Sequence, residues 1–257
     1  MITRVKEGIG PSINSPFFCF GLGSCFVSNL APYFKYWQIP YGYNPLGTSF
    51  NPISIAQQLD LILSSPSQLP EYYKHQESYH ALFAANKFQH TDHAVLSENI
   101  DKQLVNSKNL LSNTKNSKLI IISFGTAHAW YMKEDLVNNC HKLPGQLFNR
   151  KLLPINEIVK EWNKLLEKIP SDYQFIFTVS PVKYTKIGLQ ENFKGKSILR
   201  LAIEELITTH QNCTYFPSYE IITDELRDYS FWNEHGTHPN DKAVAEVMSR
   251  FKNFLSL

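Results

Sequence analysis

The sequence predicts an α/β protein in which helices cover both faces of a parallel sheet. Short runs rich in aromatic and β-branched residues alternate with longer stretches whose apolar residues recur at helical spacing. Because a crossover between parallel strands needs room for a helix, this alternation favours a mainly parallel sheet. No internal repeat or linker divides the 257 residues, so residues 1–257 are predicted to form a single domain.

The spacing of the apolar residues and the residues typical of helix ends predict strands and helices in alternating order along the chain. The predicted strands are residues 17–23, 37–43, 118–124, 173–179 and 214–217. The predicted helices are residues 25–34, 53–63, 96–111, 154–169 and 194–210, followed by a last helix after Pro239. Residues 64–94 contain two prolines, four histidines and no sustained period. We expect them to form a cap, a long functional loop or a merely structural excursion.

Two of these helices have clear sequence signals. In residues 154–169 the apolar side chains fall on one face, and Pro154 stands at the start, where proline is favoured. The last helix has an apolar stripe that includes Val247 and Phe251, and Asn240 can cap its first turn. That helix therefore begins just after His238.

Composition excludes several classes of protein. With 43% hydrophobic and 13% aromatic residues against 19% charged, the chain has enough apolar surface for a sizeable core. The 25 Lys and Arg nearly balance the 23 Asp and Glu, so no nucleic-acid partner is expected. Residues 1–16 lack the apolar stretch expected of a secretory signal, and the sequence contains no apolar run of about 18 residues. We expect a cytoplasmic protein with no membrane partner, and no feature indicates an oligomeric state.

The cysteines indicate neither a disulfide framework nor a zinc ribbon, because no Cys-x-x-Cys pair occurs. Four free thiols are expected, at Cys19, Cys25, Cys140 and Cys213. No cofactor and no metal are expected.

The segment GLGSCFV at residues 21–27 is the first candidate for catalysis. An apolar strand ends in glycine and passes directly to Ser24 at a helix start. A serine there projects from the carboxyl edge of the sheet, and its backbone N–H faces a developing oxyanion near the positive helix end. A serine that merely caps the helix would give the same pattern. Cys25 is a rival nucleophile, although apolar-flanked cysteines are usually inert.

The segment NEHGTHPNDKAV at residues 233–244 is the second candidate. His238 can take the proton of a serine nucleophile and return it to the leaving group, because imidazole titrates near neutral pH. A surface histidine would look the same. A metal site made of His235, His238 and Asp241 is a further alternative, on weak grounds.

Taken together, these segments resemble the GSCFA family, a branch of the SGNH/GDSL-type hydrolase superfamily. The family's motif is matched by Gly-Ser-Cys-Phe at residues 23–26, and only the fifth letter differs, as Val27. The resemblance continues through NPLGTSFNPISI at 44–55, SFGTAHAWY at 123–131, NCHKLPGQLF at 139–148, TVSPVKY at 178–184 and YFPSYEIITDELRDYSFW at 215–232.

The resemblance implies a three-layer α/β/α flavodoxin-like fold with a mainly parallel five-stranded sheet and a site at the carboxyl ends of its strands. It also implies serine ester chemistry. Ser24 would attack an ester or acyl carbonyl, His238 would act as base and then as acid, and water or another acceptor would release the acyl group. The backbone amides of Ser24 and Gly47 would form the oxyanion hole, unless Gly47 is a plain turn residue.

Two positions depart from the superfamily's pattern. The aspartate three residues before the catalytic histidine is replaced by His235, so Glu234 or a backbone carbonyl would have to orient His238. The oxyanion asparagine is also absent, and Thr126 or His128 would replace it. Further polar candidates for the pocket are Asn139 and His141, whose plain interpretation is turn hydrogen bonding.

Two functions follow from these observations. The first is a serine esterase or acyl-transferring enzyme that acts on a small-molecule or carbohydrate-linked ester. The second is a catalytically impaired module that keeps the pocket and binds a ligand. The departures at His235 and Ala127 favour the second function, and the ordered series of motifs favours the first.

Overall fold

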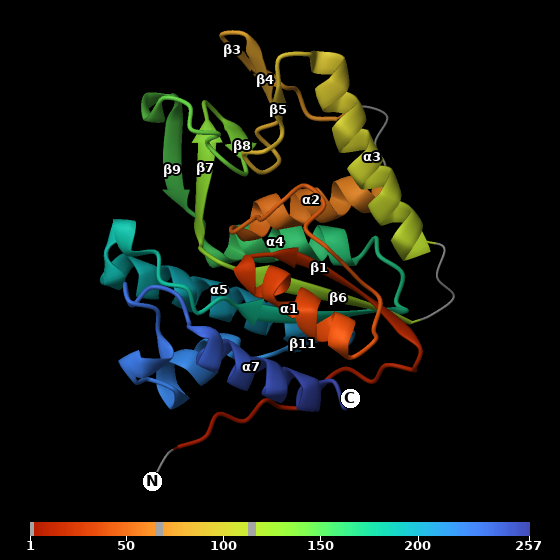
Figure 1. Ribbon diagram of the computed structural model, residues 1–257, viewed down its shortest axis with the longest axis vertical. Helices are drawn as coiled ribbons and strands as arrows, with labels where there is room; N and C mark the ends of the chain where they lie inside the picture. The colour runs from red at the N-terminus through yellow and green to blue at the C-terminus, as the bar shows by residue number, and fades with distance from the viewer. Residues whose placement is uncertain (1–2, 65–68, 113–116) are drawn as a thin grey trace.

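The computed structural model describes residues 3–64, 69–112 and 117–257 (Figure 1). Its centre is a sheet of five strands in which every pair is parallel. The strands are β1 (Phe17–Gly23), β2 (Tyr41–Tyr43), β6 (Ser117–Phe124), β10 (Tyr173–Val179) and β11 (Cys213–Tyr215). They lie in the order β11-β10-β6-β1-β2, which is the doubly wound order of flavodoxin-like folds. The predicted three-layer α/β/α architecture is confirmed.

Side chains of the sheet alternate between two cores, as the period of a strand requires. In β1, Phe18, Phe20 and Leu22 pack in one core, whereas Phe17 and Cys19 pack in the other. Both faces are therefore covered by helices, and most residues of the strands β1, β6 and β10 are buried. The first core also contains residues of α2 (Pro52–Ser64), α3 (His93–Ser112), α4 (Ile155–Leu166) and α5 (Leu189–Thr209). The second contains residues of α1 (Cys25–Tyr36) and α7 (Asp241–Phe254).

The predicted elements agree with the structure except at some boundaries. Asn240 caps α7, and its Oδ1 accepts from the backbone N–H of Ala243 at 3.1 Å, as predicted. The predicted strand at 37–43 begins too early, because α1 runs to Tyr36 and only Tyr41–Tyr43 pair with β1. The short helix α6 (Ser218–Glu220) and the π-helical turn at Ile221–Glu225 have no counterpart in the prediction.

Two small antiparallel sheets are drawn above α2 and α4, at the top of Figure 1. Because β7 starts at His128, only four residues after the end of β6, its sheet begins next to the carboxyl end of the parallel sheet. One small sheet consists of β3 (Tyr73–His75), β4 (Ser78–His80) and β5 (Gln89–His90). The other consists of β7 (His128–Met132), β8 (Asp135–Val137) and β9 (Phe148–Leu152).

Residues 64–94, predicted to form a cap, a long functional loop or a structural excursion, contain the small sheet of β3, β4 and β5. Residues 65–68 lie outside the described part of the chain. Two backbone hydrogen bonds fasten the segment. Ala85 donates to Leu46 at 2.8 Å, and Asn138 donates to Leu82 at 2.7 Å. Through these two bonds the segment is attached to the loop after β2 and to the residue that follows β8.

A pair of buried histidines lies between the two small sheets. His80 and His141 are 5% and 3% exposed, and their ring centroids are 5.6 Å apart in an edge-on arrangement. His141 Nε2 lies 3.1 Å from the carbonyl of Ala84. Burial lowers the pKa of His141 to about 4, so this imidazole is neutral at neutral pH.

This histidine makes the fold sensitive to acid. In the unfolded chain its pKa returns to about 6.5, so protons favour the unfolded state below that pH. The stability that His141 contributes is present above pH 6.5 and is lost as the pH falls towards 4. We expect His141→Gln to lose less stability than the wild type over this range, measured as the thermal midpoint against pH. The exposed His90→Gln is the control, and it should follow the wild-type curve; equal curves for His141→Gln would contradict this role.

Of the helices in the described part of the chain, none has the length and apolar character needed to cross a membrane.

Candidate active site

The turn from β1 into α1 depends on a glycine. Gly23 has φ of 129°, and a Cβ at this position would lie 2.2 Å from the carbonyl oxygen of Ser123. The loop after β2 holds the turn from the other side, because Asn44 Oδ1 accepts from the Gly23 N–H at 2.9 Å. The chain can therefore leave the strand close to β6 and begin the helix at Cys25.

Ser24 is the N-cap of α1, and its polar groups are used within the protein. Its hydroxyl lies 2.6 Å from the hydroxyl of Ser123 and accepts from the backbone N–H of Phe26 at 3.3 Å. Its own N–H donates to the Ser123 carbonyl at 3.0 Å. The side chain is buried, and no bond joins it to His238 among the residues with described positions. The Ser24 amide, the predicted oxyanion donor, is therefore already paired in this structure.

Cys25 is the residue of this turn that faces an open space. It is partly exposed, and it lines a cavity of about 60 Å³ together with His238, Asn29 and Ser180. In the described structure no oxygen accepts the Cys25 N–H, which lies against its own sulfur. Burial raises the pKa of the thiol, and the contact with its own N–H partly offsets this effect. Cys25 and His238 thus line one cavity, and Ser24 is not among the described residues that line it.

His238 is held by its own loop. Its Nδ1 lies 3.0 Å from the hydroxyl of Thr237, and Asn233 Oδ1 accepts from the backbone N–H of both Thr237 and His238. Glu234, the predicted orienting acid, instead lies 3.3 Å from His235, and both side chains are exposed. The group that contacts Nδ1 of His238 is therefore the Thr237 hydroxyl. It was not predicted, because only a carboxylate or a backbone carbonyl was expected to orient His238.

The alternative metal site is not formed. Across residues 3–64, 69–112 and 117–257, no three His, Cys, Asp or Glu side chains gather as metal ligands. His235, His238 and Asp241 accordingly do not make such a cluster.

Lys183 fastens the histidine loop to the loop after β10. Its backbone N–H donates to the Thr237 carbonyl at 2.9 Å. Its ammonium lies 3.7 Å from the ring centroid of Trp232 and 5.0 Å from that of Tyr229, which is cation–π geometry. Lys183 therefore fixes the position of the loop that carries His238.

Lys196 is a buried lysine on α5 that the sequence analysis also missed. Its ammonium donates to the carbonyls of Gly125 at 2.6 Å and Ser180 at 2.5 Å, the residues that follow β6 and β10. Burial lowers its pKa to about 7. Lys196 thus joins the carboxyl ends of β6 and β10. Ser180, which follows β10, also belongs to the wall of the cavity that holds Cys25.

The other predicted oxyanion donor is also occupied. The Gly47 N–H donates to the carbonyl of Asn44 at 2.8 Å, and φ of Gly47 is 81°. A Cβ added at position 47 would lie 2.3 Å from the Cβ of Ala85. Glycine is therefore needed for this tight turn, which packs against the segment of residues 64–94. The geometry fits the plain turn interpretation of Gly47, whose amide, the second predicted oxyanion donor, is paired in this structure.

The remaining predicted residues lie outside the cavity that holds Cys25. Thr126 Oγ1 accepts from the His128 N–H at 3.1 Å, and burial lowers the pKa of His128. Asn139 Oδ1 accepts from the His141 N–H at 3.0 Å in a local turn. These pairs have structural partners, as the plain interpretation of Asn139 and His141 expects.

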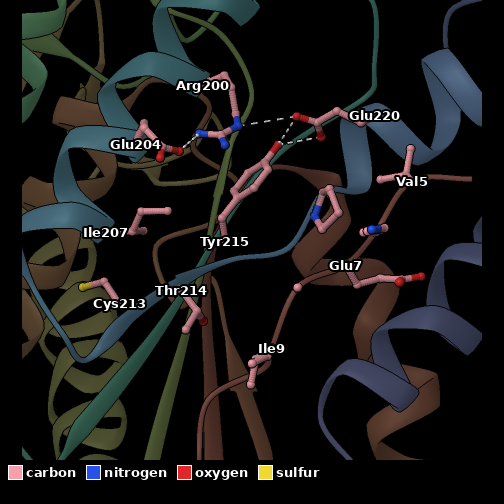
Figure 2. Close-up of a pocket in the computed structure, with 13 residues that line it drawn as sticks. Val5, Glu7, Ile9, Arg200, Glu204, Ile207, Cys213, Thr214, Tyr215 and Glu220 are labelled. Atoms are coloured by element: carbon pink, nitrogen blue, oxygen red, sulfur yellow. Dashed lines mark hydrogen bonds and ion pairs between the residues drawn. The ribbon is translucent and has the colours of Figure 1, made fainter.

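A second cavity, of about 540 Å³, lies between the segment around Val5 and the edge strand β11 (Figure 2). Its arginine and two of its glutamates form one network. Arg200 lies 2.7 Å from Glu204 and 3.6 Å from Glu220, and the Tyr215 hydroxyl donates to Glu220 at 2.7 Å. These four side chains are already engaged with one another, so size alone does not make this cavity the functional site.

By its strand order the protein is a doubly wound α/β protein, the class in which ligands bind beyond the carboxyl ends of the strands. Cys25 and the Ser180 wall of its cavity follow directly after such ends. Comparison with known protein families then gives the particular assignment: the chain belongs to the GSCFA family, which it matches over residues 19–251. The predicted family resemblance is confirmed. No curated protein and no solved structure gives a significant match.

Proposed function

We propose that the protein is an acyl-transfer enzyme of the esterase type, in which Cys25 is the nucleophile and His238 the base. One observation carries the proposal: Cys25 and His238 line the same cavity, whereas the hydroxyl and amide of Ser24 are paired with Ser123. This proposal keeps the ester chemistry expected from the sequence and moves the nucleophile by one residue.

In the first half of the reaction, His238 Nε2 takes the thiol proton as Cys25 Sγ attacks the carbonyl carbon of an ester. The Cys25 N–H, at the positive end of α1, donates to the oxygen that becomes negative. When the tetrahedral intermediate collapses, the carbon–oxygen bond breaks and His238 gives its proton to the departing alcohol. A thioester on Cys25 remains.

In the second half, water or another hydroxyl compound attacks this thioester. His238 takes the proton of the attacking group, the carbon–sulfur bond breaks, and the proton returns to the sulfur. With water the product is a carboxylic acid, and with an alcohol it is a new ester. A small-molecule or carbohydrate-linked ester is the substrate we propose, and its alcohol part would remain on the solvent side of the exposed His238.

The elevated pKa of Cys25 explains why the site needs a base. Since burial raises this pKa, the thiol is protonated at neutral pH and does not form a thiolate on its own. The Thr237 hydroxyl at Nδ1 leaves Nε2 of His238 available for proton transfer. Placement in the SGNH/GDSL-type superfamily remains part of this proposal; the turn after the first strand supports it, with a thiol at the start of the helix in place of a hydroxyl.

Replacing His238 with alanine tests the proposal. We expect kcat/KM for p-nitrophenyl acetate to fall by about two to four orders of magnitude, which is the usual contribution of a general base. The assay is the release of p-nitrophenol at several pH values. His90→Ala, at an exposed histidine of β5, is the matched control and should keep the wild-type rate. Wild-type turnover by His238→Ala would disprove the role of His238, and a wild type without turnover would favour the ligand-binding module.

A further inference from the structure

The wall of the Cys25 cavity suggests which acyl group the enzyme transfers. Apart from Cys25 and His238, the wall is largely apolar and is formed where α1, α7 and the residues after α6 meet. Its buried apolar members include Phe26, Ile222, Val247 and Met248. An acyl chain bound to the sulfur would lie against these side chains.

The buried part of the cavity has no group that pairs with a charge. Among the described residues that line it, none is Asp, Glu, Lys or Arg, and the polar Asn29 and His238 are exposed. The two buried serines are already bonded: Ser218 Oγ donates to the Val179 carbonyl at 2.9 Å, and Ser180 Oγ accepts from the Val182 N–H at 3.4 Å. A carboxylated acyl group would therefore lose its hydration without gaining a partner.

The size of the cavity limits the length of the chain. One water-sized group needs roughly 10–15 Å³ of such space. A cavity of about 60 Å³ therefore accepts only a few carbon atoms beside the sulfur. Four of its apolar side chains, those of Phe26, Ile222, Val247 and Met248, are at most 7% exposed, so a longer chain would have to displace packed core residues.

We propose that the acyl group transferred by Cys25 is neutral and short, with about two to four carbon atoms. This inference rests on the proposed function and adds the substrate class. The acyl chain occupies the apolar cavity beneath Cys25, and the alcohol part of the ester lies outside it, beside His238.

A panel of p-nitrophenyl acetate, butyrate and octanoate tests the inference. We expect the wild type to prefer butyrate over octanoate by at least about tenfold in kcat/KM. Met248→Ala removes a side chain from the cavity wall and should reduce this preference by about tenfold. Val244→Ala, at a partly exposed lining residue, should reduce it in the same direction if the first variant folds poorly. Leu255→Ala is the control, because Leu255 belongs to the same core but does not line the cavity.

The outcomes separate the two proposals. Turnover that depends on Cys25 but treats octanoate and butyrate alike would overturn the short-chain inference and leave the acyl-transfer function standing. The same holds if both cavity variants keep the wild-type preference. If no ester of the panel is turned over by any Cys25-dependent route, the proposed function fails, and the inference fails with it.

Discussion

Replacing Cys25 with alanine will lower kcat/KM for ester substrates by about four orders of magnitude or more, because it removes the thiol that we propose forms the acyl-enzyme. The expected loss exceeds that of His238→Ala, since without the base a thiol can still react slowly. Little loss of stability should accompany it, because the Cys25 side chain is partly exposed and no hydrogen bond joins its thiol to another described residue. Release of p-nitrophenol and the thermal midpoint are the two measurements.

Ser24→Ala is the matched variant, one residue away in the same turn. It removes the N-cap of α1 and the contact with Ser123, so we expect it to cost about 1 kcal/mol of stability. Its kcat/KM should stay within about tenfold of the wild type. The reverse pattern, with activity lost in Ser24→Ala and kept in Cys25→Ala, would assign the nucleophile to Ser24 and contradict our proposal.

Gly23→Ala is expected to have the largest effect on stability. Its φ of 129° is one that side chains rarely adopt, and the added Cβ would lie 2.2 Å from a backbone oxygen of β6. Strands β1 and β6 would have to move apart, which we expect to lower the free energy of unfolding by about 3 kcal/mol or more.

Urea unfolding of purified protein measures this effect. Gly145→Ala is the matched control, because a Cβ there meets no atom within 4 Å and φ is not in the left-handed region. That variant should unfold within about 0.5 kcal/mol of the wild type. A Gly23→Ala protein as stable as the control would show that the turn is not as tightly packed as described.

The fold could largely be predicted because its signals are local. Strands β1, β6 and β10 are buried on both faces, so each reads as a continuous apolar run. Helices α4 and α7 carry an apolar stripe and recognisable starts. The small sheets could not be predicted, since their strands are two to five residues long and are only partly buried.

The turn that carries the candidate nucleophiles could be predicted from the motif, but not which of their side chains lines the cavity. Whether Ser24 or Cys25 faces the cavity depends on how the chain leaves Gly23 beside Ser123. Lys196 could not be found either. Its carbonyl partners lie 71 and 16 residues away in sequence, and nothing in the pattern of α5 marks it.

The most direct test is to trap and locate the acyl group. The protein is mixed with excess p-nitrophenyl acetate, quenched in acid, digested and analysed by tandem mass spectrometry, with neutral hydroxylamine to separate thioesters from oxygen esters. We expect an acetyl group on Cys25 that hydroxylamine removes quickly, and that His238→Ala fails to accumulate. An oxygen ester on Ser24, or no acetyl group on the peptide that contains residues 23–26, would contradict the assignment of Cys25 as the nucleophile.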